Sequence, residues 1–216
     1  MDIGLAVVGV FAVIFLIVGL IGPMYAQLRL RDWREPTESD RQAIDDREPQ
    51  EPVSLTRTVV IETVGEASVE VAIRGPPGYR VLFISDYVLE ELDSEVGWAL
   101  LSAEMARVRL FYRDYQVVAA AIAIALGTAA FLLVIPFELG FGGLLVVAAV
   151  MLTIGRRLQY RADRVAAETV GAAELADAFE TIGELHGADL SSGGWRTYLE
   201  VQPPLGDRIE RLRDQA

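Results

Sequence analysis

Three long apolar stretches constrain the fold of this chain more than any other feature. They cover residues 3–22, 117–136 and 139–155, and a helix needs about 20 mostly apolar residues, about 17 at the short limit, to cross the hydrocarbon core of a membrane. Their only polar side chains are Thr128 and Thr153. Ionisable side chains inside membrane spans mark proton or ion paths. The sequence therefore predicts a multi-pass membrane protein in contact with the lipid bilayer and disfavours a transporter.

Arginines gather at one end of each predicted span and indicate its orientation. They follow residue 28, precede residue 117 and follow residue 155, whereas the turn between the second and third spans carries only Glu138. Because basic residues stay on the cytoplasmic side, we expect the N-terminus outside the cell membrane, both soluble segments in the cytoplasm, and a tight hairpin of the last two spans. No basic segment precedes the first span, so we interpret it as a retained anchor, with a cleaved signal peptide as the alternative.

The charged residues are strongly unbalanced. Aspartate and glutamate number 31 against 19 basic residues, all of them arginine, and the formal net charge is -12. Such a surface repels the phosphates of nucleic acids, so we expect no nucleic-acid partner. Such a composition is typical of proteins that stay solvated in concentrated salt. We favour adaptation to a high-salt cytoplasm as its cause over undirected drift in composition. Cysteine is absent and His186 is the single histidine, which excludes disulfides and Cys-ligated metals.

The soluble chain before the second span changes from an irregular to a strand-like pattern. Residues 29–54 are acidic, contain three prolines and lack apolar periodicity, which predicts a flexible linker. Runs rich in β-branched residues at 56–64, 68–75 and 80–85 predict three strands. We therefore expect a small sheet that packs on the helices that follow it.

Helical patterns make up the rest of the soluble chain. They cover residues 92–115, about 157–185 and 207–213, and Asp93 suits the start of the first helix. The predicted fold class is therefore α+β with transmembrane helices. We divide the chain into an anchor at 1–28, the linker at 29–54, a cytoplasmic part with strands and a helix at 55–116, a transmembrane hairpin at 117–155 and a cytoplasmic helical part at 156–216.

Three motifs in this order resemble those of a family of membrane peptidases. They read "LFISDYVLEELDSEVGWALLSAEMARV", "RRLQYRADRVAAETVG" and "VQPPLGDRIERLR", and the membrane hairpin separates the first from the second. Over roughly residues 68–213, this order resembles the HtpX-like and CaaX-prenyl-protease family of integral-membrane zinc metallopeptidases. The resemblance implies a gluzincin-like metalloprotease domain that is interrupted by a transmembrane hairpin.

The positions that hold zinc in this family carry other residues here. In the family, two histidines one helical turn apart and a glutamate bind the metal, and the glutamate beside the first histidine activates the metal-bound water. By resemblance, the three ligand positions are Ala103, Arg107 and Gln159, and the base is Glu104. Asp163 matches a supporting aspartate of the family, and Gln202 stands at the position of a closing histidine.

Of the three ligands and the base, only the base, Glu104, is retained in this sequence. A methyl group offers no lone pair, and a guanidinium is always cationic, so Ala103 and Arg107 do not bind zinc. A register shifted by one residue places Ser102 and Ala106 at the histidine positions, and it restores no histidine either. We therefore expect a lost metal site and no cofactor.

We expect a membrane-anchored, catalytically inactive metalloprotease homologue, a pseudoprotease whose groove holds a protein or peptide partner. Two other functions stay open. One is an active membrane zinc metalloendopeptidase with the atypical ligands Glu104, Asp163 and His186, and the other is a purely structural membrane protein. In the pseudoprotease, we expect Arg107 to replace the metal by bridging Glu104 and Asp163, with a hydrogen bond from Gln159. In the alternative, the Arg107 side chain lies at the level of the lipid headgroups.

Overall fold

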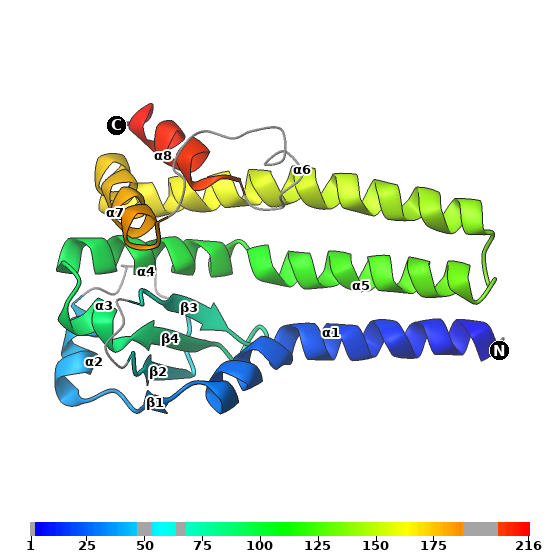
Figure 1. The fold of residues 1–216 in the computed structure, drawn as a ribbon, viewed down its shortest axis with the longest axis horizontal. Coiled ribbons are helices and arrows are strands. Elements are labelled where there is room, and N and C mark those ends of the chain that lie inside the picture. The colour runs from blue at the N-terminus through cyan, green and yellow to red at the C-terminus, as the bar shows by residue number, and fades with distance from the viewer. Residues whose placement is uncertain (1–2, 47–52, 64–67, 188–202) are drawn as a thin grey trace.

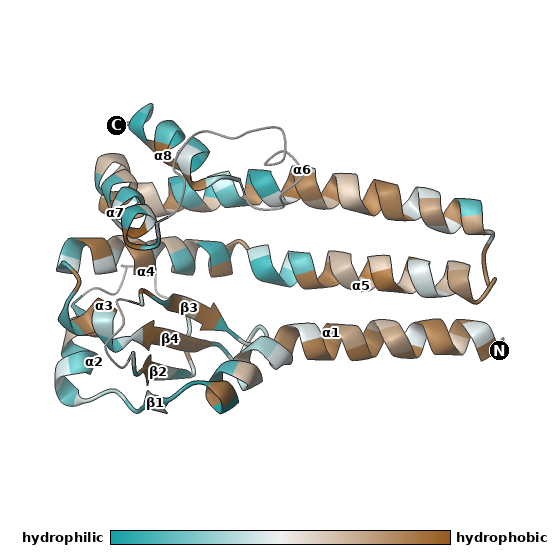
Figure 2. Ribbon diagram, in the orientation of Figure 1, coloured by the Kyte–Doolittle hydropathy of each residue, from teal (hydrophilic) through white to brown (hydrophobic). Residues whose placement is uncertain are grey.

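Three long helices lie side by side and give the molecule its elongated shape (Figure 1). The computed structural model describes most of the chain, namely residues 3–46, 53–63, 68–187 and 203–216. Helices α1 (Ile3–Leu30), α5 (Tyr112–Phe131) and α6 (Phe137–Val170) cover the three apolar stretches, except for residues 132–136, and are long and apolar enough to cross a membrane. Figure 2 shows apolar residues along these helices away from the sheet and polar residues beside it.

Small residues bring these helices close together. A Cβ atom added to Gly19 of α1 would lie 2.7 Å from Val117 of α5, and one added to Gly140 of α6 would overlap Ala130 of α5. Small residues at such crossings are common among membrane helices. The predicted tight hairpin is present, but its turn covers residues 132–136, inside the predicted second span. Glu138, predicted to lie in the turn, belongs to the first turn of α6.

A four-stranded sheet lies beside the end of α1. Its strands are β1 (Trp33–Arg34), β2 (Arg57–Ile61), β3 (Val71–Arg74) and β4 (Val81–Ser85). The strand order is β1, β2, β4, β3, with β2 and β4 parallel and both outer pairs antiparallel. Strands β2, β3 and β4 fall inside the three predicted runs, so that prediction is confirmed, and β3 is an edge strand.

The two faces of the sheet pack on different helices. One face, which includes Ile73, packs on Met105 of α4 (Ser94–Arg109). The opposite face, which includes Phe83, packs on Leu28 of α1. These apolar contacts hold the edge strand β3 beside α4, the helix that carries most of the candidate site.

A second core joins α4 to the C-terminal helices α7 (Ala172–Leu185) and α8 (Leu205–Arg213). At the contact between α4 and α6, the side chains of Ala103, Ala162 and Ala166 are at most 2% exposed. Because alanine is small, the two helix backbones approach closely there. The short helix α3 (Asp86–Glu90) links β4 to α4, and Asp93 caps α4 through the backbone N–H of Glu95, as predicted.

The helical patterns predicted at 92–115 and 157–185 are each interrupted. The first is divided at Phe111, which has a positive φ of 53° between α4 and α5. The second is divided at Gly171, whose φ of 98° separates α6 from α7. Helix α6 also continues without a break through residue 155. Its polar end is therefore one rod with the third span, which holds the candidate site at a fixed position relative to the membrane helices.

The segment predicted as a flexible linker contains ordered elements, so that prediction is wrong for its described residues. Strand β1 pairs with β2, and the side chain of Thr37 caps α2 (Glu38–Asp45). The Asp40 carboxylate accepts hydrogen bonds from Arg34 and from the backbone N–H of Thr37, and Ile44 is buried in the core. Local capping and one buried apolar contact thus order an acidic segment that lacks apolar periodicity.

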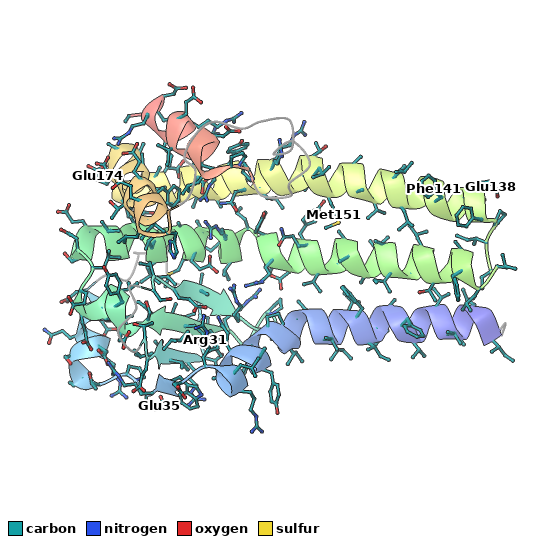
Figure 3. All side chains as sticks on the ribbon, viewed as in Figure 1. Arg31, Glu35, Glu138, Phe141, Met151 and Glu174 are labelled. Carbon is teal, nitrogen blue, oxygen red and sulfur yellow. The ribbon has the colours of Figure 1, made fainter. Side chains whose placement is uncertain are left out.

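Both soluble segments lie at the same end of the three long helices. In Figure 3, Arg31 and Glu174 lie at the end that carries the sheet, whereas Glu138 and Phe141 lie at the opposite end beside the hairpin turn. One folded unit therefore forms on one side of the predicted membrane. That this side is the cytoplasm stays a prediction.

Candidate functional site

Helices α4 and α6 carry the five motif positions that the structure describes. Ala103, Glu104 and Arg107 lie on α4, and Gln159 and Asp163 lie on the polar end of α6. All except Arg107 are buried, with exposed fractions between 2% and 8%. The structure thus places the motif positions on two helices that pack together, as the resemblance implies.

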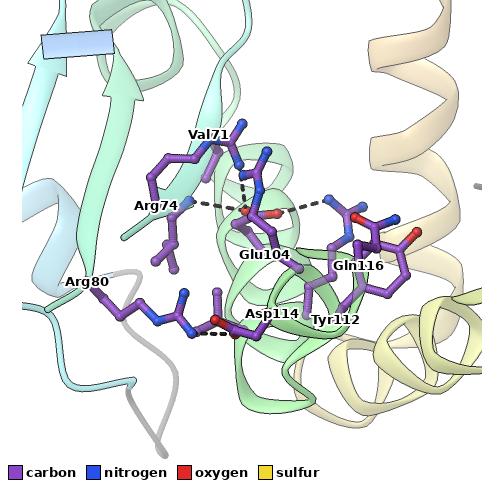
Figure 4. Close-up of a pocket in the computed structure, with 11 residues that line it drawn as sticks. Val71, Arg74, Arg80, Glu104, Tyr112, Asp114 and Gln116 are labelled. Atoms are coloured by element: carbon purple, nitrogen blue, oxygen red, sulfur yellow. Dashed lines mark hydrogen bonds and ion pairs between the residues drawn. The ribbon is translucent and has the colours of Figure 1, made fainter. Parts of the chain in front are cut away.

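The Glu104 carboxylate is held by groups from two elements. One oxygen accepts a hydrogen bond from the backbone N–H of Ile73 in β3 at 3.1 Å, and the other accepts one from Arg107 at 2.9 Å. A guanidinium nitrogen of Arg74 lies 3.8 Å from the first oxygen (Figure 4). This carboxylate therefore fastens the edge strand β3 to α4.

The Asp163 carboxylate is held by different partners. Arg208 of α8 donates two hydrogen bonds to it, at 2.8 and 2.7 Å, and Gln159 donates a third at 3.1 Å. The Arg208 guanidinium also lies over the ring of Phe179, 4.2 Å from its centroid. Asp163 is 4% exposed, so this buried charge depends on Arg208 for its compensation.

The predicted bridge of Arg107 between Glu104 and Asp163 is wrong. Arg107 pairs with Glu104, but it forms no ion pair with Asp163, whose oxygens are occupied by Arg208. Arg208 reaches Asp163 from a separate helix and presents both donors of its planar fork. The signal was available, since Arg208 belongs to the motif "PPLGDRIERLR". The predicted hydrogen bond from Gln159 is present, although it supports Asp163 alone.

The remaining candidate residues do not complete a site. His186 is exposed at the end of α7, and its ring nitrogen lies 3.0 Å from the backbone oxygen of Ile182. Ser102 and Ala106, the positions of the shifted register, are both buried. Gln202 lies outside the described residues. Within the described parts of the chain, no three His, Cys, Asp or Glu side chains are grouped so that they could hold a metal ion.

The residues at the motif positions do not fit a zinc ion. The Ala103 methyl group packs among the alanines between α4 and α6. Arg107 presents a cation, and the amide nitrogen of Gln159 points toward Asp163 as a hydrogen-bond donor. Zinc requires nitrogen, sulfur or oxygen atoms with free lone pairs at about 2.0–2.3 Å. Neither the chemistry of these donors nor the tight alanine contact suits that requirement.

A cavity of about 180 Å³ opens beside Glu104 (Figure 4). Its walls are β3, α4 and the first turns of α5, and β3 is the last strand in the sheet order. The cavity therefore follows the free edge of the sheet. At this edge the backbone N–H of Ile73 is already bonded to Glu104.

Arginine dominates the polar lining of this cavity. Arg74, Arg80, Arg107 and Arg113 all line it, and we call it the arginine pocket. Of these four arginines, only Arg107 occupies one of the motif positions in the sequence. Arg74 and Arg80 reach the pocket only through the pairing of β3 with β4, so no local pattern in the sequence identifies them.

Two of these arginines differ in their environment. Arg80 is 4% exposed and donates to the backbone oxygen of Gly75 and to Asp114 of α5. Burial lowers the pKa of Arg74, while the nearby carboxylates of Glu104 and Glu70 raise it and the charge of Arg107 lowers it further. The Arg74 guanidinium is therefore incompletely compensated for the water that it has lost.

Comparison with known proteins identifies a similar fold. No protein-family model matches the chain, and no curated protein sequence is significantly similar to it. The crystal structure of S. mikatae Ste24p matches over 93% of this chain with a TM-score of 0.69 and 15% sequence identity. The chain spans 55% of the length of that structure. It therefore has a membrane-protease-like fold, similar to that of Ste24p.

Proposed function

We propose that this protein is a catalytically inactive, HtpX-like homologue of membrane zinc metallopeptidases that binds a protein partner. The neighbour in fold, Ste24p, is a membrane zinc metallopeptidase of the CaaX prenyl protease type. The observation that carries the proposal is the set of groups at the ligand positions. Ala103, Arg107 and Gln159 offer a methyl group, a cation and an amide, where a metallopeptidase needs three metal ligands.

The state of Glu104 supports the same proposal. A general base must accept a proton from a water molecule within hydrogen-bond reach. Each Glu104 oxygen accepts one hydrogen bond, from Ile73 or from Arg107, and no group of metal ligands among the described residues could hold a water molecule for it to activate. The carboxylate is thus used to hold the strand and the helix together.

The cavity beside β3 supports a binding role. An extended peptide binds a sheet by pairing with the free N–H and C=O groups of an edge strand. The strand β3 offers such an edge along the arginine pocket, and Glu104 already occupies one of its donors, the N–H of Ile73. A protein segment that adds to β3 therefore competes with Glu104 for this group.

The two other functions have less support. An active endopeptidase would need Glu104, Asp163 and His186 near one another, and the described residues contain no such group of metal ligands. A purely structural role leaves the cavity beside an edge strand without a purpose. No observation on the described residues favours either function over partner binding.

A proteolysis assay tests the loss of activity. The reconstituted protein is incubated with unfolded soluble and membrane substrates, with and without a metal chelator, beside the variant Glu104→Gln. We expect no cleavage that the chelator inhibits. Cleavage that is abolished both by the chelator and by Glu104→Gln contradicts the proposal.

Crosslinking in native membranes tests the binding role. A photoreactive residue replaces Val71, which lines the cavity on β3, and a control carries it at Arg164, which is exposed on α6. We expect position 71, and not position 164, to yield one defined protein adduct. Equal yields from both positions contradict partner binding at the β3 edge.

A further inference from the structure

The arginine pocket carries a surplus of positive charge. Four arginines line it, against the two carboxylates of Glu104 and Asp114. The chain as a whole has a formal net charge of -12. A cationic pocket in an acidic protein is a local feature that the overall composition does not explain.

Each of the two carboxylates already forms an ion pair with one of the arginines. Glu104 accepts from Arg107 at 2.9 Å, and Asp114 accepts from Arg80 at 2.5 Å. Arg74 lies 3.8 Å from Glu104, beyond hydrogen-bond distance, and Arg113 has no hydrogen bond or ion pair to any residue that the structure describes. Arg74 and Arg113 are thus the surplus cations of the pocket.

Two buried donors of the pocket also lack an acceptor. The Nε group of Arg107 and the hydroxyl of Tyr112 are buried without a hydrogen-bond partner among the described residues. The Tyr112 side chain is 4% exposed and lines the same cavity. The side-chain amide of Gln116, one turn further along α5, lies near this hydroxyl, but the contact does not have the geometry of an ordinary hydrogen bond. One buried acceptor of the pocket, Asp114 Oδ1, is unpaired as well. Because buried donors are costly when unpaired, a group that supplies acceptors and negative charge would satisfy Arg107 and Tyr112.

The pocket lies where the apolar parts of the membrane helices end. Arg74, Arg80 and Arg113 also line a small adjoining pocket. Leu20 and Pro23 of α1 and Asp114 of α5 are among its other lining residues. The apolar stretch of α1 ends at residue 22, and that of α5 begins at residue 117. The surplus charges therefore lie at the level of the lipid headgroups, next to the contact between α1 and α5.

We propose that the arginine pocket binds the phosphate of an anionic phospholipid. A phosphate offers several acceptor oxygens, and the planar guanidinium groups of Arg74 and Arg113 match it in charge and geometry. A soluble anion has the same chemistry, but the position of the pocket beside α1 and α5 favours a phosphate that arrives with acyl chains. This proposal rests on the pocket alone and stands whether or not the protein is a protease.

Native mass spectrometry of the detergent-solubilised protein measures this binding. The probes are phosphatidylglycerol and phosphatidylcholine with identical acyl chains, and inorganic phosphate. The two lipids share the phosphate, but phosphatidylcholine also brings a trimethylammonium cation close to the four arginines of the pocket. We therefore expect phosphatidylglycerol to bind about tenfold more tightly than phosphatidylcholine. Equal affinity for the two lipids overturns the proposal. Inorganic phosphate that binds as tightly as phosphatidylglycerol overturns the lipid assignment.

A matched pair of arginine variants locates the site. Arg113→Gln removes a surplus charge of the pocket, and Arg164→Gln removes an exposed charge of α6. We expect Arg113→Gln to weaken phosphatidylglycerol binding about tenfold and Arg164→Gln to leave it unchanged. Equal affinities in both variants overturn the proposal.

A matched pair of tyrosine variants separates binding from folding. Tyr112→Phe removes a hydroxyl without a partner, whereas Tyr115→Phe removes one that donates to the backbone oxygen of Val150 at 3.0 Å. Without lipid, we expect Tyr112→Phe to melt at or above the temperature of the unchanged protein and Tyr115→Phe to melt below it. With phosphatidylglycerol, we expect only Tyr112→Phe to lose affinity, by about threefold or more. Unchanged lipid affinity in Tyr112→Phe contradicts the role of this hydroxyl.

Discussion

Arg208 of α8 holds both carboxylate oxygens of Asp163 in α6, with nitrogen–oxygen distances of 2.8 and 2.7 Å. This pair lies next to Gln159, the residue that occupies the position of the third metal ligand by resemblance. The guanidinium of Arg208 also rests on the ring of Phe179 in α7. The last helix of the chain is thereby fixed to α6 and α7 by one side chain.

Loss of Arg208 leaves a buried carboxylate without its counter-charge. The Asp163 side chain is 6% exposed and that of Arg208 is 11% exposed. We expect Arg208→Ala to lower the free energy of unfolding by about 3 to 5 kcal/mol, the usual cost of breaking a buried pair. Chemical denaturation in detergent measures this change, with Arg164→Ala as the exposed control. A loss of no more than about 1 kcal/mol, typical of exposed pairs, contradicts the assigned role.

Loss of Arg107 has a smaller expected effect. Its side chain is 29% exposed, and without it Glu104 still accepts from the backbone of Ile73 and lies near Arg74. We expect Arg107→Ala to lower the free energy of unfolding by about 1 to 2 kcal/mol, the cost of one charged hydrogen bond. The same denaturation experiment should therefore rank Arg208→Ala above Arg107→Ala in destabilisation, and the reverse order contradicts the pairing described here.

Asp86 makes the free energy of unfolding depend on pH in the acidic range. Burial raises the pKa of Asp86, but hydrogen bonds from the side chain and backbone of Thr63 and from the backbone of Tyr87 outweigh it and hold the pKa below its ordinary value. A carboxyl group whose pKa is lowered by folding stabilises the protein above its unfolded pKa, about 3.9. This contribution is lost as the pH falls through the lower, folded pKa.

The variant Asp86→Asn tests this dependence, and Asp45→Asn, at an exposed position, is its control. We expect the free energy of unfolding to fall less steeply below about pH 4 in Asp86→Asn than in the control. Denaturant titrations between about pH 7 and pH 3 span this range. Identical slopes in the two variants contradict the role of Asp86.

The orientation of the protein in the membrane is testable because the chain contains no cysteine. Single cysteines replace Ser54, which precedes β2, Glu184 of α7, and Glu138 in the first turn of α6. We expect an impermeant thiol reagent to label position 138 on intact cells and to label positions 54 and 184 only after the cells are opened. Labelling of positions 54 and 184 on intact cells, without position 138, reverses the orientation.

The elements that sequence analysis predicted correctly have a strong local signal. The apolar stretches, the β-branched runs of β2, β3 and β4, and the cap at Asp93 each depend on neighbours in the chain. In the acidic segment around Thr37, the capping box of Thr37 with Asp40 is a local signal that was missed. The rest of its order comes from tertiary contacts, through the pairing of β1 with β2 and the burial of Ile44. Local patterns do not contain such contacts.

The candidate site was predictable in its positions but not in its pairing. The motif positions on α4 and α6 lie on packed helices, as the resemblance implies. The partner of Asp163 depends on where α8 docks, and the partner of Glu104 depends on the register of β3, which presents the N–H of Ile73. Charge pairing between distant elements follows from their packing, which spacing along the chain does not give.

Metal content tests the loss of the zinc site most directly. Elemental analysis is performed on the full chain after purification at neutral pH, with the variant Ala103→His, Arg107→His, Gln159→Glu analysed beside it as a restored ligand set. We expect the unchanged protein to contain far less than one zinc ion per chain, whether or not the variant binds zinc. Close to one zinc per chain, removed by a chelator, would contradict this expectation.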